Sequence, residues 1–392
     1  MDKKKELSFN LNNFLLALSL PIDYLRKDKC SSSINYSKRV AYLSLNIGKQ
    51  LNLTPQEMSD LCSYSLLHSI GLLNCSNLSK EYCESSNNIS KSFPFLLENK
   101  DILKYQSEYF DGSGLYGLKG DKTPLFSQIL SFAIALENRF NLSIIDTKGR
   151  ANVTNFVKSS ENELFSKIIT DIFLEISQKC SFWLDLQNEN EILYFIFSNL
   201  HDFTITLKFE EVLKICSNLY FINNSDSLLL SYVEQMSDFY KFEHKDKFTF
   251  LIAASLCKIG KLCVPSSIID KKSTLDEFEY DEIKSYPYYT NKVLSNIMGF
   301  SDINSWAIKI QERVDQNGYP YSLAAKDLSL KDRLLAILVI YDALRLNKTY
   351  RSAYTHEESI DILKDLAKQG KIDISIVEDI NVVISPNKQK YN

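Results

Sequence analysis

An all-α fold built from two helical domains in tandem is the fold class that this sequence predicts. Three observations lead to it: apolar residues recur at helical spacing, helix-capping patterns are frequent, and the same landmarks occur twice. From Tyr36, for example, Val40, Leu43, Ile47 and Leu51 follow a helical period. A chain of 392 residues also exceeds the length that one hydrophobic core usually organises, so two domains are expected.

Several helices can be placed from local patterns. Thr54-Pro55-Gln56-Glu57 is a capping box with Pro at the first helical position. Further boxes are Thr274…Glu277, Thr355…Glu358 and, with Asp in place of Glu, Ser329…Asp332, and the long apolar helices predicted are Phe126 to Leu136 and Leu334 to Leu344. Phe203 to Phe209 alternates as a strand does, with an extended inter-domain linker as the alternative.

An internal repeat is indicated by landmarks that recur at nearly constant offsets. His68, in Leu67 to Gly71, aligns with Cys257 at an offset of 189 residues. Glu108 and the glycine-rich loop that begins at Asp111 align with Glu312 and the loop at Asp315 at an offset of 204. The sequence therefore predicts a first domain over 1–180, a linker over 181–210 and a second domain over 211–392.

Composition narrows the classes of protein. The net charge is −4 and no strongly basic face is evident, which argues against nucleic-acid binding. No secretory signal or apolar stretch long enough to span a membrane is visible, so we expect a cytoplasmic protein without membrane contact. The eight cysteines show no CxxC pairing and are expected to be free thiols. The four histidines lie far apart in sequence, so no local pair forms a helical metal clamp.

The second copy resembles the HD-GYP family of helical phosphohydrolases, which cleave cyclic di-GMP with bound metal ions. The resemblance is carried by Ile259-Gly260-Lys261, Tyr286-Pro287, Glu312-Arg313, Gly318-Tyr319-Pro320 and Tyr341-Asp342-Ala343. The first copy, from about Tyr36 to Ser177, keeps Arg39-Val40, Ile70-Gly71, Glu108 and the glycine loop.

The resemblance also identifies the positions at which the family's His and Asp residues hold metals. In the first copy these positions carry Tyr36, His68, Ser69, Gln106, Ser107 and Ile134, and in the second they carry Ser225, Cys257, Lys258, Tyr286, Ile310, Gln311 and Val339. Only His68 is a family ligand type. Hydrolysis in the family depends on a metal-activated hydroxide, so the substitutions predict an inactive protein that needs no cofactor.

The leading hypothesis from sequence is therefore a catalytically inactive regulatory module with a protein partner, cyclic-dinucleotide binding and self-association as expectations. The ligand-binding candidates include Lys261, Arg313 and Arg333, because cationic groups suit phosphate oxygens. Tyr319 and Pro320 are further candidates because the resemblance implies that the Tyr-Pro loop lies near the substrate, with a rigid turn as the alternative. Structural pairing with Glu312 or Asp332 is the alternative for these cations, and a buried core histidine is the alternative for His68.

Two further hypotheses stay open. One is a residual metal-dependent phosphodiesterase acting on cyclic di-GMP, using ligands such as His68, Glu108 and Asp111. The other is a transcriptional or stress regulator, which the absence of a basic recognition helix disfavours.

Overall fold

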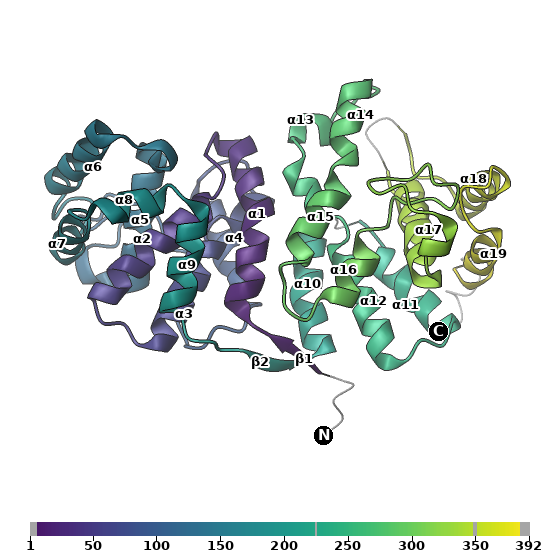
Figure 1. Ribbon diagram of the computed structural model, residues 1–392, viewed down its shortest axis with the longest axis horizontal. Helices are drawn as coiled ribbons and strands as arrows, with labels where there is room; N and C mark the ends of the chain where they lie inside the picture. The colour runs from purple at the N-terminus through teal and green to yellow at the C-terminus, as the bar shows by residue number, and fades with distance from the viewer. Residues whose placement is uncertain (1–5, 224–225, 348–350, 385–392) are drawn as a thin grey trace. The chain divides into compact units, whose positions relative to one another are not determined.

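The chain forms two compact helical units, described in a computed structural model over residues 6–223, 226–347 and 351–384. The first unit comprises Asn10–Thr204, and the second comprises the N-terminal strand with residues 205–392. The predicted all-α class is confirmed, because helices form the body of both units and the described strands are two short ones (Figure 1).

The helices of the first unit run in purple to teal in Figure 1. They are α1 (Leu11–Cys30), α2 (Tyr36–Gln50), α3 (Pro55–Leu67), α4 (Lys80–Ser90), α5 (Leu125–Arg139), α6 (Thr147–Ser159), α7 (Lys167–Ile176), α8 (Cys180–Leu186) and α9 (Glu189–Asn199), with 3-10 turns η1 (Ile70–Leu73), η2 (Gly120–Lys122) and η3 (Leu142–Ile144). Where the sequence predicts a linker over 181–210, the structure has α8, α9 and the strand β2.

The second unit begins with the pairing of two distant strands, β1 (Glu6–Phe9) and β2 (Ile205–Lys208), which are antiparallel with Glu6 opposite Lys208. Its helices are α10 (Phe209–Asn223), α11 (Leu229–Phe239), α12 (His244–Leu256), α13 (Ser266–Ile269), α14 (Glu277–Lys284), α15 (Tyr286–Leu294), α16 (Ser301–Ala307), α17 (Leu330–Arg345), α18 (His356–Lys368) and α19 (Ile374–Val383), with 3-10 turns η4 (Ile259–Cys263) and η5 (Ala325–Asp327). The strand interpretation of Phe203 to Phe209 thus holds for its central residues.

Most of the predicted helix starts occur as expected, and one is wrong. Capping boxes are present at Thr54, Ser329 and Thr355. The box predicted at Thr274 lies two residues later, because Asp276 caps α14 and its carboxylate accepts a hydrogen bond from the backbone N–H of Glu279 at 2.9 Å. An Asp cap satisfies the same backbone donors as Thr, and the neighbouring acidic residues made both registers plausible from sequence.

The two units repeat the same packing at a helix end. Both α3 and α12 are followed by a 3-10 turn, and the glycine of this turn lies against α4 in the first unit and against α15 in the second. A Cβ on Gly71 or Gly260 would lie 2.4 Å from Tyr82 O or 2.0 Å from Tyr286 O, respectively. The glycine N–H donates to Ser86 Oγ in the first unit and to Thr290 Oγ1 in the second. These pairs extend the predicted repeat with contacts that the sequence did not show.

A buried glutamate organises the glycine-rich loop of each unit. The Glu108 carboxylate accepts the N–H groups of Tyr116 and Leu118. Glu312 accepts those of Tyr321 and Leu323, at 2.9 and 3.0 Å. Both glutamates are 2% exposed, so the loop backbone supplies the hydrogen bonds that a buried carboxylate requires.

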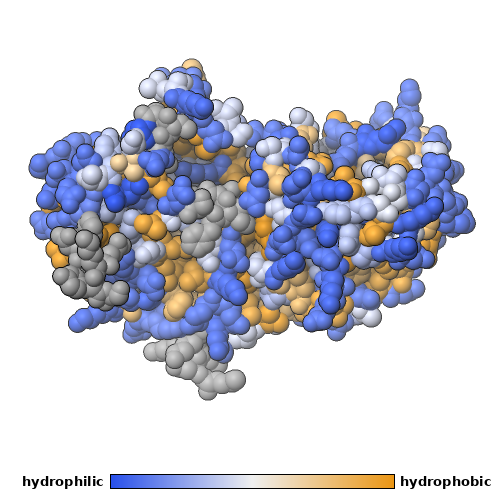
Figure 2. All heavy atoms as spheres, turned by 180° about the vertical axis from the view of Figure 1, so that it is seen from behind, coloured by the Kyte–Doolittle hydropathy of each residue, from blue (hydrophilic) through white to orange (hydrophobic). Residues whose placement is uncertain are grey.

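Hydrophilic side chains make up most of the face shown in Figure 2, with apolar side chains showing between them. No helix within the described ranges is long and apolar enough to cross a membrane. All eight cysteines lie in described segments and are free, five of them buried, as the sequence predicted.

Candidate ligand cavity in the second unit

A cavity of about 260 Å³ lies at the end of α12 in the second unit. Its described lining consists of Lys258, Lys261, Tyr286, Gln311, Val339, Ile340, Ala343, Leu344, Leu346 and Arg351. Three of these side chains are cationic and none is a carboxylate. Four of the positions that the resemblance assigns to metals, Lys258, Tyr286, Gln311 and Val339, therefore meet around one open space.

The three cations are held differently. Lys258 Nζ lies 3.3 Å from Asp342 Oδ2, and this carboxylate also accepts from Ser227 Oγ and from the backbone N–H of Leu228. Because Asp342 is 1% exposed and Lys258 only 13%, the pair is largely removed from water. A partner that close neutralises most of the Lys258 charge, so the positive charge offered to the cavity comes mainly from the other two cations.

Arg351 is oriented by the C-terminal end of α17. Its Nη2 donates to Ala343 O at 2.8 Å and its Nη1 to Leu344 O at 3.1 Å. Carbonyl groups at a helix end lack intrahelical partners, so the guanidinium satisfies them and is fixed in place. Lys261 enters from η4, with its Nζ 5.3 Å from the centre of the Tyr286 ring.

A polar wall connects the cavity to the loop of Tyr319 and Pro320, two of the predicted ligand-binding residues. Gln311 Nε2 donates to the Tyr286 hydroxyl at 2.8 Å, and Arg313 Nη2 lies 3.4 Å from Gln311 Oε1. The Tyr319 N–H donates to Gln311 O. Burial raises the pKa of Tyr286 well above its ordinary value, so its hydroxyl stays protonated. Arg313 and Tyr319 thus border the cavity through Gln311 and do not line it.

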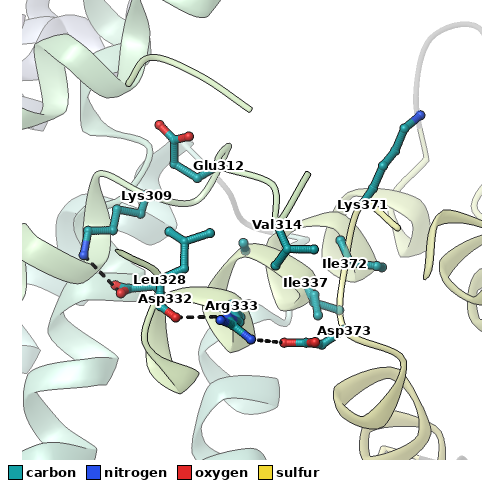
Figure 3. Close-up of a pocket in the computed structure, with 11 residues that line it drawn as sticks. Lys309, Glu312, Val314, Leu328, Asp332, Arg333, Ile337, Lys371, Ile372 and Asp373 are labelled. Atoms are coloured by element: carbon teal, nitrogen blue, oxygen red, sulfur yellow. Dashed lines mark hydrogen bonds and ion pairs between the residues drawn. The ribbon is translucent and has the colours of Figure 1, made fainter. Parts of the chain in front are cut away.

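Arg333 is placed elsewhere. It belongs to a small pocket between α17 and the segment before α19, where its Nη1 pairs with Asp373 Oδ2 at 2.8 Å and its Nε donates to Leu328 O (Figure 3). The neighbouring Asp332 pairs with Lys309 at 3.0 Å. The structural alternative therefore describes Arg333 better than the ligand-binding one, and the cavity does not include it.

Four of the six corresponding positions of the first unit are buried. His68, Ser69 and Gln106 are 0% exposed and Tyr36 is 1% exposed. His68 Nδ1 lies 2.6 Å from Ser65 O, and burial lowers the pKa of this imidazole to about 3. His68 is thus a neutral, hydrogen-bonded core histidine. Of the remaining two positions, Ser107 and Ile134 are partly exposed.

The three groups proposed as residual metal ligands are not brought together. His68 is engaged by Ser65 and Ser69, Glu108 by its own loop, and the exposed Asp111 by the N–H of Ser113 at 2.8 Å. Within the described parts of the chain, no three His, Cys, Asp or Glu side chains converge in a way that holds a metal ion.

Sequence reasoning missed two residues of these sites, Arg351 and Arg26. Arg351 stands just after a helix that was predicted, yet nothing local shows that its side chain folds back on that helix. Arg26 had a usable signal: it continues the 3–4 residue spacing of Leu15, Leu18 and Ile22, which predicts a buried position for a charged side chain.

The fold and the site together define an all-α protein of the HD-domain class. A family model described as an HD domain matches residues 213–376, within the second unit. The solved structure of a cyclic GMP-AMP-specific phosphodiesterase of Vibrio cholerae, V-cGAP3, matches with a TM-score of 0.68 at 17% identity, covering 97% of this chain and 99% of that one. At this identity the match establishes the shared fold.

Curated relatives are similar over different lengths. The 3'3'-cGAMP-specific phosphodiesterase 1 of Vibrio cholerae serotype O1 is 21% identical, covering 98% of this chain and 94% of the relative. The cyclic di-GMP phosphodiesterase PdeB of Borreliella burgdorferi is 32% identical, over 30% of this chain and 31% of the relative. These matches support the resemblance to the HD-GYP family, with an HD domain over residues 213–376.

The prediction that this protein is a catalytically inactive module is contradicted by these relatives. They are named as phosphodiesterases, and one of them aligns with nearly the whole chain. The prediction went wrong by taking the loss of metal-ligand types as sufficient evidence of lost activity. A protein partner and self-association stay predictions.

The residues present do not fit the metal centre that the family implies. At the second-unit positions, Lys258 supplies an ammonium group, and Ile310 and Val339 supply no ligand atom. Burial raises the pKa of the Cys257 thiol to about 11, and its Sγ donates to Ala254 O. Ser225 lies outside the described residues. No metal-dependent step is derived for this cavity.

Proposed function

We propose that this protein is a phosphodiesterase acting on cyclic dinucleotides, and that the second-unit cavity binds a phosphate group of the ligand. One observation carries the proposal: Lys258, Lys261 and Arg351 surround a cavity whose described lining contains no carboxylate. Such a lining favours an anion, and a cyclic dinucleotide carries one negative charge on each of its phosphates. The names of the relatives support this class of ligand.

The arrangement of the cations suits a phosphodiester. Arg351 places a guanidinium charge at the cavity, where backbone carbonyl groups hold it, and Lys261 adds a point charge from η4. Tyr286 and Gln311 form a polar wall between these groups and the Tyr319 loop. In hydrolysis, negative charge develops on the phosphate oxygens, and cations already placed around the cavity stabilise it.

Part of the lining is apolar, and ribose carbons find contacts with it. It consists of Val339, Ile340, Leu344 and Leu346. A volume of about 260 Å³ is smaller than the roughly 300–1,000 Å³ of pockets that enclose drug-sized ligands. The cavity therefore takes one phosphate with its ribose, and the rest of the dinucleotide stays at the mouth.

The test uses the purified full-length chain with 3'3'-cGAMP and cyclic di-GMP. Binding is measured by isothermal calorimetry, and the linear dinucleotide product by chromatography, with and without added Mn²⁺. We expect binding and formation of the linear product, both reduced in Arg351→Ala. Lys368→Ala, which removes a cation that is 75% exposed on the same unit, is the matched control and should change neither. Binding without any linear product would overturn the phosphodiesterase, and absence of binding would overturn the proposal as a whole.

A further inference from the structure

A buried arginine stands at the centre of the first unit. Arg26 belongs to α1 and is 1% exposed, although its guanidinium is charged throughout the physiological pH range. Its Nη1 donates to Ser69 Oγ at 3.2 Å, and its Nη2 to Tyr36 Oη at 3.1 Å and Asn138 Oδ1 at 2.7 Å. The guanidinium carbon also lies 4.0 Å from the centre of the Tyr36 ring. A buried cation is stable only with such partners.

The hydrogen bonds around Arg26 run in one direction. Ser69 Oγ accepts a hydrogen bond from the guanidinium. The Ser69 hydroxyl therefore donates its own hydrogen to His68 Nε2, at 2.9 Å. The His68 ring then donates through Nδ1 to Ser65 O. The Tyr36 hydroxyl likewise accepts from Arg26 and donates to Asn138 Oδ1 at 2.8 Å. The lone pair on His68 Nε2 therefore already accepts a hydrogen bond from Ser69.

The same place in the second unit is the open cavity. By the offsets of the repeat, Lys258 and Val339 of the cavity lining correspond to Ser69 and Ile134 of the first unit. Arg26 donates to Ser69, and Tyr36 Oη lies 3.4 Å from Ile134 O. Helix α10 packs on α12 as α1 packs on α3, yet α10 contains no arginine. Its described buried side chains carry no charge: Val212, Ile215 and Leu219 are apolar, and the Tyr220 hydroxyl is hydrogen-bonded to Ser227 Oγ.

We infer that Arg26 is a built-in cation that fills the first unit's counterpart of the cavity, so that cyclic dinucleotides bind only in the second unit. The first half, that Arg26 fills the place of the cavity, stands on the contacts of Arg26 alone. The second half, that cyclic dinucleotides bind only in the second unit, rests on the proposed function. A fixed internal guanidinium takes the acceptor groups that an external cation or a ligand would otherwise meet, and the zero exposure of Ser69 and His68 leaves no path to them.

Chemical complementation tests the first half. Arg26→Ala leaves a hole lined by the Tyr36, Ser69 and Asn138 acceptors, and we expect its melting temperature to fall by about 5–10 °C. Guanidinium at low millimolar concentration should enter this hole and recover a large part of the loss, whereas neutral urea of similar shape should not. Wild type and Arg26→Met, in which an uncharged side chain occupies the space, should not respond to guanidinium.

If Arg26→Ala purifies unfolded, the same titration becomes a refolding experiment, and guanidinium but not urea should restore helical circular dichroism. Equal responses of Arg26→Ala and wild type, or no recovery in the refolding experiment, would contradict the built-in cation. The second half is tested by calorimetric stoichiometry: one cyclic dinucleotide per wild-type chain is expected, and two would overturn it. If no cyclic dinucleotide binds at all, the proposed function fails while the guanidinium result still decides the role of Arg26.

Discussion

In the first unit Arg26 is 1% exposed and bonded to three side chains, whereas in the second unit Lys258, Lys261 and Arg351 line a cavity of about 260 Å³. Both centres are positively charged, and both lie where a helix ends in a 3-10 turn. The difference is the space around the cations. In the first unit side chains of the protein fill the space around Arg26, and in the second the cations line a cavity with room for an external anion.

The comparison teaches that the two repeats share the surrounding turns and loops, the shared shell, more than they share the side chains at their centres. The glycine contacts and the glutamate-held loops occur in both units, because they depend on backbone positions. The central side chains differ in charge, size and partners. Four experiments, taken from the largest expected effect to the smallest, break or sharpen this contrast.

The largest expected effect is on the free energy of unfolding when an ion pair near each centre is broken. Arg39→Ala leaves the Glu137 carboxylate, which is 1% exposed, without its partner at 2.7 Å, and we expect the free energy of unfolding to fall by about 3–5 kcal/mol. Lys258→Ala should cost less than half of that, since Asp342 keeps the Ser227 hydroxyl and the Leu228 N–H and the cavity admits water. Urea denaturation followed by circular dichroism measures both; equal losses would erase the contrast.

Ligand binding should depend on the second unit alone. Lys261→Ala removes a charge-assisted contact worth about 1.5–3 kcal/mol, so the affinity for a cyclic dinucleotide should fall roughly 10- to 100-fold in calorimetry. Lys29→Ala is the matched control in the first unit, where Lys29 Nζ donates to Leu72 O at 2.6 Å beside the equivalent turn. A similar loss of affinity in both variants would place a ligand in the first unit as well.

The shared shell should respond alike in both units. Gly71→Ala and Gly260→Ala each force a Cβ to within 2.4 and 2.0 Å, respectively, of a backbone oxygen. We expect each to lower the free energy of unfolding by about 1–3 kcal/mol, because the turn must move away from α4 in the first unit or α15 in the second. Thermal unfolding of the two variants checks this. A loss confined to one unit would show that the turns are not equivalent.

Just below neutral pH, the smallest expected effect is the pH dependence of stability that His68 causes. Its pKa is lowered to about 3 by burial, while an unfolded histidine has an ordinary value of 6.5, so the unfolded state binds more protons between these values. The contribution of His68 to stability is complete above pH 6.5 and decreases as the pH falls toward 3. His68→Gln should flatten the stability profile in that window by at most about 1.4 kcal/mol per pH unit. An unchanged profile in urea titrations at several pH values would show that His68 is not buried as a neutral ring.

Most of the fold could be predicted because its signals are local. The boxes at Thr54, Ser329 and Thr355 form between residues three apart, so the sequence suffices to place them. The repeat could be read from ordered landmarks. The positions of the resemblance could also be named from sequence, yet their substitutions misled the prediction about activity.

The amino-acid sequence by itself determined the helical class, the two-fold repetition and which residue types stand at the central positions. Only the tertiary structure decided that β1 pairs with β2, that Arg351 folds back on α17, and that Arg26 meets Ser69 and Asn138, which are 43 and 112 residues away. Contacts over such separations depend on how helices pack. The spacing of side chains along one helix does not specify which helix packs against it.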